Sequence, residues 1–264
     1  MRVSRFVLAV FLVFVFSLSL GSQQLTSPQR DAGAVAVVEQ AVGALGGQTF
    51  LGSIVDSVST GEIVANSDDS TQNSAFTWKT KSGEFRYEVQ AQNGSSKVFV
   101  SGHGHPANSE NGNTSALPQF TALATPAFHL PGIVLLSRLL DPQFAITAMG
   151  TSGLANGQLG VHIRVRSSLQ SASAAVTQQD WYIDQSTGLP FRVEYCLPSV
   201  DRSDDCAPST IEYSDYHSVS AIAVPFTLKF SLPDGSANLA KVSSTSFNVG
   251  LSAADFDLLT RSAQ

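Results

Sequence analysis

Residues Asp180–Cys196 decide the fold, and they read Asp-Trp-Tyr-Ile-Asp-Gln-Ser-Thr-Gly-Leu-Pro-Phe-Arg-Val-Glu-Tyr-Cys. In the first half, Trp181 and Ile183 fall on one face, because successive side chains of a β-strand point to opposite sides of the sheet. The polar residues and glycine from Asp184 to Gly188 are typical of a tight turn. The second half is expected to gather its apolar side chains on one face as well, at Leu189, Phe191, Val193 and Tyr195. The stretch therefore predicts a β-hairpin with one buried face.

The same alternation of apolar and polar residues recurs along most of the chain. In a second predicted hairpin, Tyr213–Phe230, apolar residues occupy every second position from Ile222 onward. The polar stretch Gly104–Ser115 is expected to be a loop. About ten strands are expected in all. Those outside the two hairpins are Ile54–Val64, Ala75–Thr80, Glu84–Gln90, Lys97–Ser101, Gln143–Met149, Leu159–Arg166 and Asn238–Val249.

Three segments carry helical signals instead. In Ala32–Leu45 valines recur at three- and four-residue steps, which predicts an amphipathic helix that Gly46-Gly47 ends. Ile133–Leu140 is apolar nearly all round, so a helix there must be covered or must cover something apolar. Near the end, Ser252 is expected to cap a helical turn that has Asp255 at its third position. These signals predict an α+β protein, mainly antiparallel, with one strongly curved sheet and helices on one side.

The first residues have the pattern of an export signal. Arg2 and Arg5 precede the apolar run Phe6–Leu20, and small residues follow it. A membrane anchor usually needs about 20 apolar residues, and this run is shorter. Residues 1–21 are therefore predicted to be a cleaved signal peptide, with a retained anchor as the alternative. Cleavage would leave no transmembrane anchor and an exported protein, either periplasmic or extracellular.

The rest of the chain is predicted to be a linker at residues 22–31 and a single domain at residues 32–264. The formal net charge is −6 for the 264 residues, and removing the two leader arginines makes it more negative. An acidic surface argues against binding to nucleic acid and against electrostatic docking on anionic lipid. No cysteine lies near the cleavage site, which excludes a lipoprotein acylated there.

The two cysteines of the chain, Cys196 and Cys206, flank a polar stretch. In an exported protein this spacing predicts a disulfide that closes the end of a hairpin. Closing so short a loop would stabilise the fold by roughly 3 kcal/mol in the chain-entropy description. Two free thiols are the alternative.

The strongest metal signal is His103 with His105, which would share one face of a strand. A third ligand is required, and Glu110, His129 and His217 have no diagnostic spacing to this pair. The glycines and proline around the pair indicate that the strand ends there. Solvated loop histidines are the preferred interpretation, and no metal site or cofactor is predicted.

No nucleophile or acid–base pair can be assigned from the sequence. Gly150–Gly153 contains Ser152 but lacks the spacing of a Gly-x-Ser-x-Gly elbow, so a turn is expected there. The sequence has no phosphate-binding loop and no His-Glu-x-x-His motif. No catalytic residue is therefore predicted. The prominent carboxylates are expected to alternate outward on strands or to lie in turns, namely Asp180, Asp184, Glu194 and Asp215.

Large apolar side chains on the predicted strands and on Ile133–Leu140 admit two interpretations. They form a filled core, or they surround a space under the helix that receives an acyl chain. A 16-carbon chain leaving water would supply roughly 12 kcal/mol of gross driving force. The candidate ligand-binding residues are Phe76, Trp78, Phe85, Tyr87, Phe99, Ile133, Leu136, Leu139, Leu140, Trp181, Phe191, Phe226 and Phe230.

The segment Phe76-Thr-Trp-Lys-Thr-Lys-Ser-Gly-Glu-Phe-Arg-Tyr-Glu88 resembles the second hairpin of the periplasmic lipoprotein carriers of the LolA/LolB type. The Gly-Leu-Pro-Phe191 and Val224-Pro-Phe226 segments and the closing Phe247–Phe256 fit the same layout, over residues 32–258. The resemblance implies an unclosed β-barrel whose helices form a lid over a hydrophobic cavity for lipid chains.

The sequence departs from that family at the turn of the hairpin. Lys81 stands where the family has a buried arginine that helps to switch the lid, and Ser82 stands where it has a proline. The Gly104–Ser115 insertion and the predicted disulfide are further differences. A ligand other than a lipoprotein is therefore an alternative on the same fold.

Three functions follow from the sequence and the resemblance. The first is a non-enzymatic carrier or binder of lipid or lipoprotein acyl chains, with envelope proteins as further candidate partners. The second is an envelope scaffold or interaction domain with a filled core. The third is a metal-dependent enzyme that uses His103 and His105.

Overall fold

The fold is that of a computed structural model in which residues 28–258 are described, except 68–69, 103–104, 125, 154–158, 169–174 and 199–205. The described strands form one sheet in the order β6-β5-β4-β3-β2-β1-β13-β12-β11-β10-β9-β8-β7. The chain thus builds one arm outward from β1 to β6, crosses to the far edge at β7, and returns strand by strand to β13. The predicted open antiparallel sheet is confirmed, with thirteen strands where about ten were expected.

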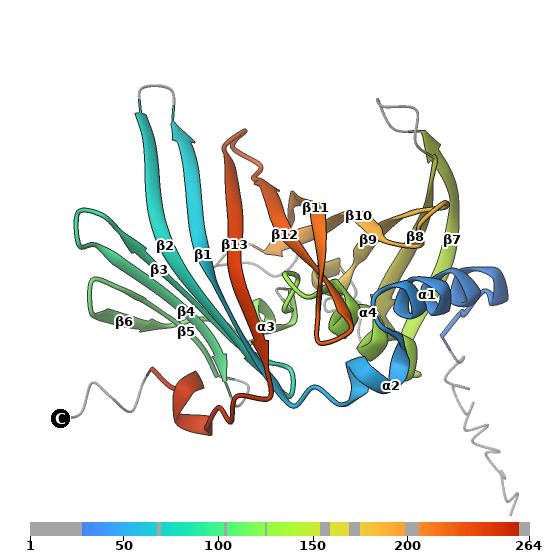
Figure 1. The fold of residues 1–264 in the computed structure, drawn as a ribbon, viewed down its shortest axis with the longest axis horizontal. Helices are drawn as coiled ribbons and strands as arrows, with labels where there is room; N and C mark the ends of the chain where they lie inside the picture. Colours follow the sequence, from blue (N-terminus) through green and yellow to red (C-terminus); the bar gives the residue numbers. More distant parts are fainter. Residues whose placement is uncertain are drawn as a thin grey trace, which may run out of the picture.

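The strands have the following bounds: β1 Asp56–Ser67, β2 Ser70–Lys81, β3 Glu84–Ala91, β4 Ser96–Gly102, β5 His105–Glu110, β6 Asn113–Ala116, β7 Phe144–Gly153, β8 Leu159–Ser167, β9 Gln179–Asp184, β10 Pro190–Pro198, β11 Cys206–Val219, β12 Ile222–Ser231 and β13 Ala237–Phe247. All their pairings are antiparallel. Figure 1 shows the sheet bending between its two arms, so that one face is concave.

Helices occupy the concave side of the sheet, between its two arms (Figure 1). They are α1 Ala32–Ala44, α2 Gly47–Gly52, α3 Phe120–Ala124 and α4 Pro131–Leu140. The prediction of α1 is confirmed, but after Gly46, which has a positive φ of 129°, a second short helix follows at once. None of the helices among the described residues is both long and apolar enough to span a membrane.

The main core lies between the concave face and the helices. Trp181 is fully buried there, with Leu135 of α4 and Val38 of α1. Arg30, which the sequence places in the linker, pairs beside Ile146 of β7. Its guanidinium donates hydrogen bonds to the carbonyl oxygens at the end of α4 and beyond, those of Leu139, Asp141 and Phe144.

The prediction of a loop at Gly104–Ser115 is wrong, because β5 and β6 form an edge hairpin there. Asn111 and Gly112 both have positive φ, 51° and 86°, as a two-residue hairpin turn of the I′ type requires. An edge hairpin needs backbone pairing on one side only, so it tolerates the polar composition that suggested a loop.

The hairpin predicted at Asp180–Cys196 is confirmed as β9 and β10. The prediction that Phe191 shares a face with Val193 and Tyr195 is wrong. The register between the strands shifts between Pro190 and Arg192, which makes Phe191 the extra residue of a bulge. Its ring covers Gly160 and lies 6.1 Å from the ring of Tyr182, on the side opposite Trp181. A one-residue insertion turns a side chain to the other face of a sheet.

The predicted disulfide concerns two neighbouring strands. Cys196 of β10 pairs with Pro208, and Cys206 at the start of β11 pairs with Pro198. The side chain of Cys206 lies outside the described residues. The described part of the chain contains no free cysteine, and the disulfide stays a prediction.

Candidate functional site

An apolar pocket of about 260 Å³ opens on the concave face. A cavity of 150 Å³ can accommodate the six carbons of benzene, so by proportion this pocket has room for about ten carbons. None of its described lining residues carries a formal charge at neutral pH. They are Ile63, Trp78, Tyr87, Val89, Pro126, Phe128, His129, Tyr195, Ile211, Phe230, Leu232 and Asn238.

The β2–β3 hairpin forms one wall of the pocket. Trp78 and Tyr87 are paired across the two strands and therefore face the same side. Phe76 stacks on Trp78, with the ring centroids 3.9 Å apart. Gly61 on β1 leaves room for this stacking, because a Cβ there would collide with the Lys241 carbonyl oxygen and come within 2.7 Å of the Phe76 ring. The glycine thus lets the aromatic wall lie close to the neighbouring strand.

The segment before α4 forms the opposite wall, and two tyrosine hydroxyls hold it to the sheet. Tyr87 of β3 donates a hydrogen bond to the Pro126 carbonyl at 3.3 Å. Tyr213 of β11 donates to the Phe128 carbonyl at 3.0 Å. Burial raises the pKa of both hydroxyls, so they remain protonated donors. The segment is thereby fixed from both arms of the sheet.

Phe128 and His129 meet different parts of the pocket. The Phe128 ring lies 4.6 Å from that of Tyr195. The His129 ring lies 5.1 Å from Trp78 and 5.8 Å from Tyr87. Adjacent residues of this segment therefore contact the aromatic groups of β10 and of the β2–β3 hairpin.

His129 is the unusual group of the pocket. Only 4% of the residue is exposed, and neither ring nitrogen has a hydrogen-bond partner. Leaving such a buried polar group unpaired costs about 1–3 kcal/mol. Burial lowers the pKa of the imidazole to about 3, so it is neutral at physiological pH. A neutral imidazole offers one N–H donor and one acceptor nitrogen.

The C-terminal segment contacts the side of the β2–β3 hairpin that faces away from the pocket. This segment ends in the 3₁₀ helix η1, Ala253–Phe256, which contacts β3 and β4. Phe256 is buried against Gly102, where a side chain would collide with its backbone. The predicted cap is confirmed, because the Ser252 backbone N–H and hydroxyl both donate to the Asp255 carboxylate, at 2.9 and 3.0 Å.

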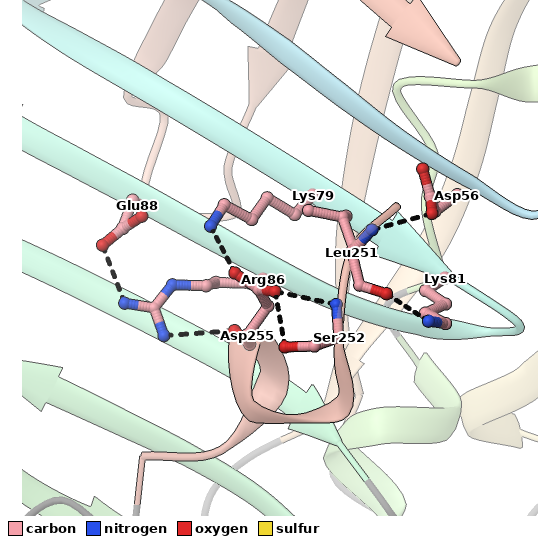
Figure 2. A network of polar contacts seen from close by, with 8 residues as sticks. All are labelled: Asp56, Lys79, Lys81, Arg86, Glu88, Leu251, Ser252 and Asp255. Carbon is pink, nitrogen blue, oxygen red and sulfur yellow. Dashed lines mark hydrogen bonds and ion pairs between the residues drawn. The ribbon is translucent and has the colours of Figure 1, made fainter. Parts of the chain in front are cut away.

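Charged side chains of the hairpin contact this segment (Figure 2). Lys79 forms an ion pair with Asp255 at 2.9 Å, and Arg86 donates to the Asp255 carbonyl at 3.3 Å. Lys81 donates to the Leu251 carbonyl. We call the segment of residues 251–256 that makes these contacts the C-terminal brace. Because Lys79 and Arg86 alternate with Trp78 and Tyr87 along their strands, the C-terminal brace lies on one side of the hairpin and the pocket on the other.

Asp56 fixes the path of the chain into that brace. The residue is 2% exposed, and its carboxylate accepts backbone N–H groups of Val249, Gly250 and Leu251 at 2.7, 3.1 and 2.9 Å. Figure 2 shows the last of these contacts beside Lys81.

The predicted ligand-binding residues divide into three groups. Trp78, Tyr87 and Phe230 line the pocket. Behind them, Phe76 stacks on Trp78, and the Phe85 ring lies 5.0 Å from Tyr87 and 5.2 Å from Phe99. The residues that do not line this pocket but lie in the core, on α4 or elsewhere on the sheet are Trp181, Ile133, Leu136, Leu139, Leu140, Phe191 and Phe226.

The α4 helix packs differently from the expected lid. Leu136 is buried in the main core, and Ile133 and Leu139 pack against it. Leu140 is 58% exposed at the end of the helix. The pocket is bounded instead by the segment that precedes α4.

The sequence did not predict His129 as a pocket residue and suggested it only as a third metal ligand. No alternation of apolar and polar residues marks the irregular segment around Pro126. The partners that enclose it come from Ile63 to Asn238 in sequence, and only the fold brings them together. Tyr195, in contrast, could have been predicted as a ligand-binding residue, because it follows Val193 on one face of β10.

The residues considered for chemistry do not converge on a site within the described chain. His105 is exposed on β5, and His103 lies outside the described residues. No group of three potential metal ligands occurs in the parts of the chain that are described. The Asp180 carboxylate forms hydrogen bonds with His162 Nε2 at 2.7 Å and with Arg164 Nε at 2.9 Å. These contacts lie on the side of the sheet opposite Trp181.

Comparison with known proteins supports the fold. No family model matches the sequence. No curated protein matches it either. A DUF1329 family protein from Desulfovibrio piger superposes with a TM-score of 0.54 at 15% identity, over 84% of this chain and 96% of that one. A protein domain from Vibrio parahaemolyticus, described as outer membrane lipoprotein-sorting, gives 0.53 at 14% identity, over 86% and 97%.

A LolA superfamily protein from Nitrosomonas europaea gives a TM-score of 0.47 at 11% identity, over 85% of this chain and 97% of that one. At identities this low, the likeness concerns architecture, and the two superpositions above 0.5 carry it. The chain has an unclosed, curved antiparallel half-barrel, the architecture that its sequence resemblance implied.

Proposed function

We propose that this protein is an exported, non-enzymatic carrier or binder of lipid or lipoprotein acyl chains, and that the pocket of the concave face is its binding site. The observation that carries the proposal is a pocket whose described lining residues are aromatic, aliphatic or uncharged polar. Concave and largely apolar sites of this kind favour apolar ligands. The shared fold with a lipoprotein-sorting domain supports the same class of function.

The size of the pocket sets the expected ligand. About ten buried methylene groups would supply roughly 8 kcal/mol of gross driving force. Association itself costs about 4–15 kcal/mol, so the net binding of one such chain is modest. A reversible carrier needs modest binding, because it must release what it binds.

Native mass spectrometry of protein exported to a periplasm and purified without detergent tests this function. A bound mass that extracts into organic solvent as a phospholipid or fatty acid is expected. A bare polypeptide mass would count against a carrier and favour the envelope scaffold or interaction domain.

A pair of variants places the ligand. Ile63→Trp adds a ring to a residue that lines the pocket, and it should reduce the amount of lipid that copurifies. Val64→Trp is the matched control, because its side chain belongs to the other side of β1 and does not line the pocket. Equal lipid content in both folded variants would place the ligand elsewhere.

A further inference from the structure

We propose that His129 is the polar anchor of the pocket and binds an uncharged oxygen of the ligand, an ester carbonyl or a hydroxyl, in preference to a carboxylate. The inference rests on the proposed function and specifies the ligand for that same pocket. An acyl chain that ends in an ester or alcohol group would place its apolar part against the aromatic wall and its oxygen at the imidazole.

The side chain of His129 has hydrogen-bonding capacity that the protein leaves unused. Among the described lining residues, it is the one with buried side-chain nitrogens that lack a partner. The hydroxyls of Tyr87 and Tyr213 already donate to carbonyls of the segment that carries His129. Buried polar groups are nearly always paired in folded proteins, so an unpaired one in a pocket wall points to a ligand atom.

The imidazole of His129 is held in place before any ligand arrives. Its ring lies 5.1 Å from Trp78 and 5.8 Å from Tyr87. The following residue, Leu130, is buried and leads directly into Pro131 at the first turn of α4. A preformed donor loses little freedom when it binds, which favours a specific contact over an incidental one.

The pocket lacks charge that could pair with a carboxylate. No described lining residue is ionised at neutral pH, and the pKa of Tyr195, another lining residue, is raised to about 12 by burial. A carboxylate in this pocket would either lie unpaired in an apolar environment or require His129 to take up a proton there. An ester or hydroxyl oxygen accepts the imidazole N–H without either cost.

The test compares four ligands that share a ten-carbon chain, namely 1-decanol, methyl decanoate, 1-chlorodecane and decanoate. Their affinities for delipidated, exported protein are measured at pH 8 by displacement of a fluorescent apolar probe. Wild type should bind 1-decanol and methyl decanoate roughly fivefold more tightly than 1-chlorodecane, as one net hydrogen bond implies. Decanoate should be the weakest of the four.

The His129→Phe variant keeps a ring but removes both nitrogens, and it should bind 1-decanol and 1-chlorodecane equally. His129→Gln retains a donor and an acceptor and should keep part of the preference, which also provides a second variant if the first folds poorly. His217→Phe is the matched control, because this histidine is exposed on β11 and does not line the pocket. It should leave the preference unchanged.

An unchanged preference for 1-decanol in folded His129→Phe would overturn the role of His129 and leave the carrier function intact. Binding of decanoate as tight as that of 1-decanol would also overturn it. If wild type binds none of the four ligands and no lipid copurifies with it, the carrier function fails and the anchor fails with it.

Discussion

Replacing Asp56 by Asn should measurably destabilise the fold, because this carboxylate holds the chain between β13 and η1. Its two oxygens accept three backbone N–H groups at 2.7–3.1 Å, and the residue is 2% exposed. An amide of the same shape has one acceptor oxygen and would direct an NH₂ group at backbone donors. Hydrogen bonds to charged acceptors are worth about 1.5–3 kcal/mol, and an unpaired buried donor costs about 1–3 kcal/mol.

We therefore expect Asp56→Asn to lower the free energy of unfolding by about 2–3 kcal/mol. For a domain of this size that corresponds to a fall in Tm of roughly 4–12 °C. Circular dichroism melting and urea titration at pH 7 measure both quantities. Glu62→Gln is the control, because Glu62 is an exposed carboxylate on the same strand. A Tm of Asp56→Asn within 1 °C of the control would refute the argument that this carboxylate fixes the C-terminal segment.

Three further changes test other contacts. The hydrogen bond from Lys79, followed by that from the Ser252 backbone, lowers the pKa of Asp255 to about 2. The ionised carboxylate of Asp255 therefore stabilises the fold by about 1 kcal/mol after solvent screening. This stabilisation is present above about pH 4 and is lost as the pH falls through 2. The Tm difference between wild type and Asp255→Asn should shrink over that window. Gly61→Ala should cost about 1–3 kcal/mol in urea unfolding, since its methyl group would meet the Lys241 carbonyl oxygen on β13 and then the Phe76 ring; an unchanged midpoint would show that β1 and β13 can separate there without cost. Tyr213→Phe should cost about 1–2 kcal/mol and speed amide exchange in the segment before α4, and unaltered exchange would count against its anchoring role.

Most of the fold could be predicted because its signals are local. Alternation along Asp180–Cys196 and along the β2–β3 hairpin identifies half-buried strands whichever strands lie beside them. The cap of η1 was equally local, since Ser252 and Asp255 are three residues apart. The errors arose where long-range pairing decides the structure. The polar β5–β6 hairpin forms because β4 offers a free edge, and Phe191 changes sides because of a bulge in its pairing with β9.

The pocket was less predictable than the fold. Trp78 and Tyr87 were identified from their alternation, but alternation cannot distinguish a side chain that fills the core from one that lines a space. Trp181 has the same signal as Trp78 and is fully buried in the core. His129 belongs to an irregular segment whose position is set by tyrosines distant in sequence. Its environment is a property of the assembled sheet.

Substitutions at Lys81 and His129 can distinguish the contribution of the C-terminal brace to stability from the ligand preference of the pocket. In the resembling family, a buried arginine at the position of Lys81 helps to switch the lid. Here Lys81 donates to the Leu251 carbonyl on the side of the hairpin that carries Lys79. On β2, Lys79 and Lys81 share a face, while Trp78 faces the pocket. Lys81 therefore contacts the C-terminal brace.

Lys81→Met should accordingly lower Tm by a few degrees, since it leaves the carbonyl of Leu251 without this donor, at a cost of about 1–2 kcal/mol. It should leave the relative affinities for 1-decanol and 1-chlorodecane unchanged. His129→Phe should do the opposite, with an altered ligand preference and a Tm that is equal or higher, because it removes an unpaired buried polar group. A Lys81→Met protein that loses the 1-decanol preference would show that the two sides of the hairpin act as one unit, and that the lysine has kept the role of the arginine it replaces.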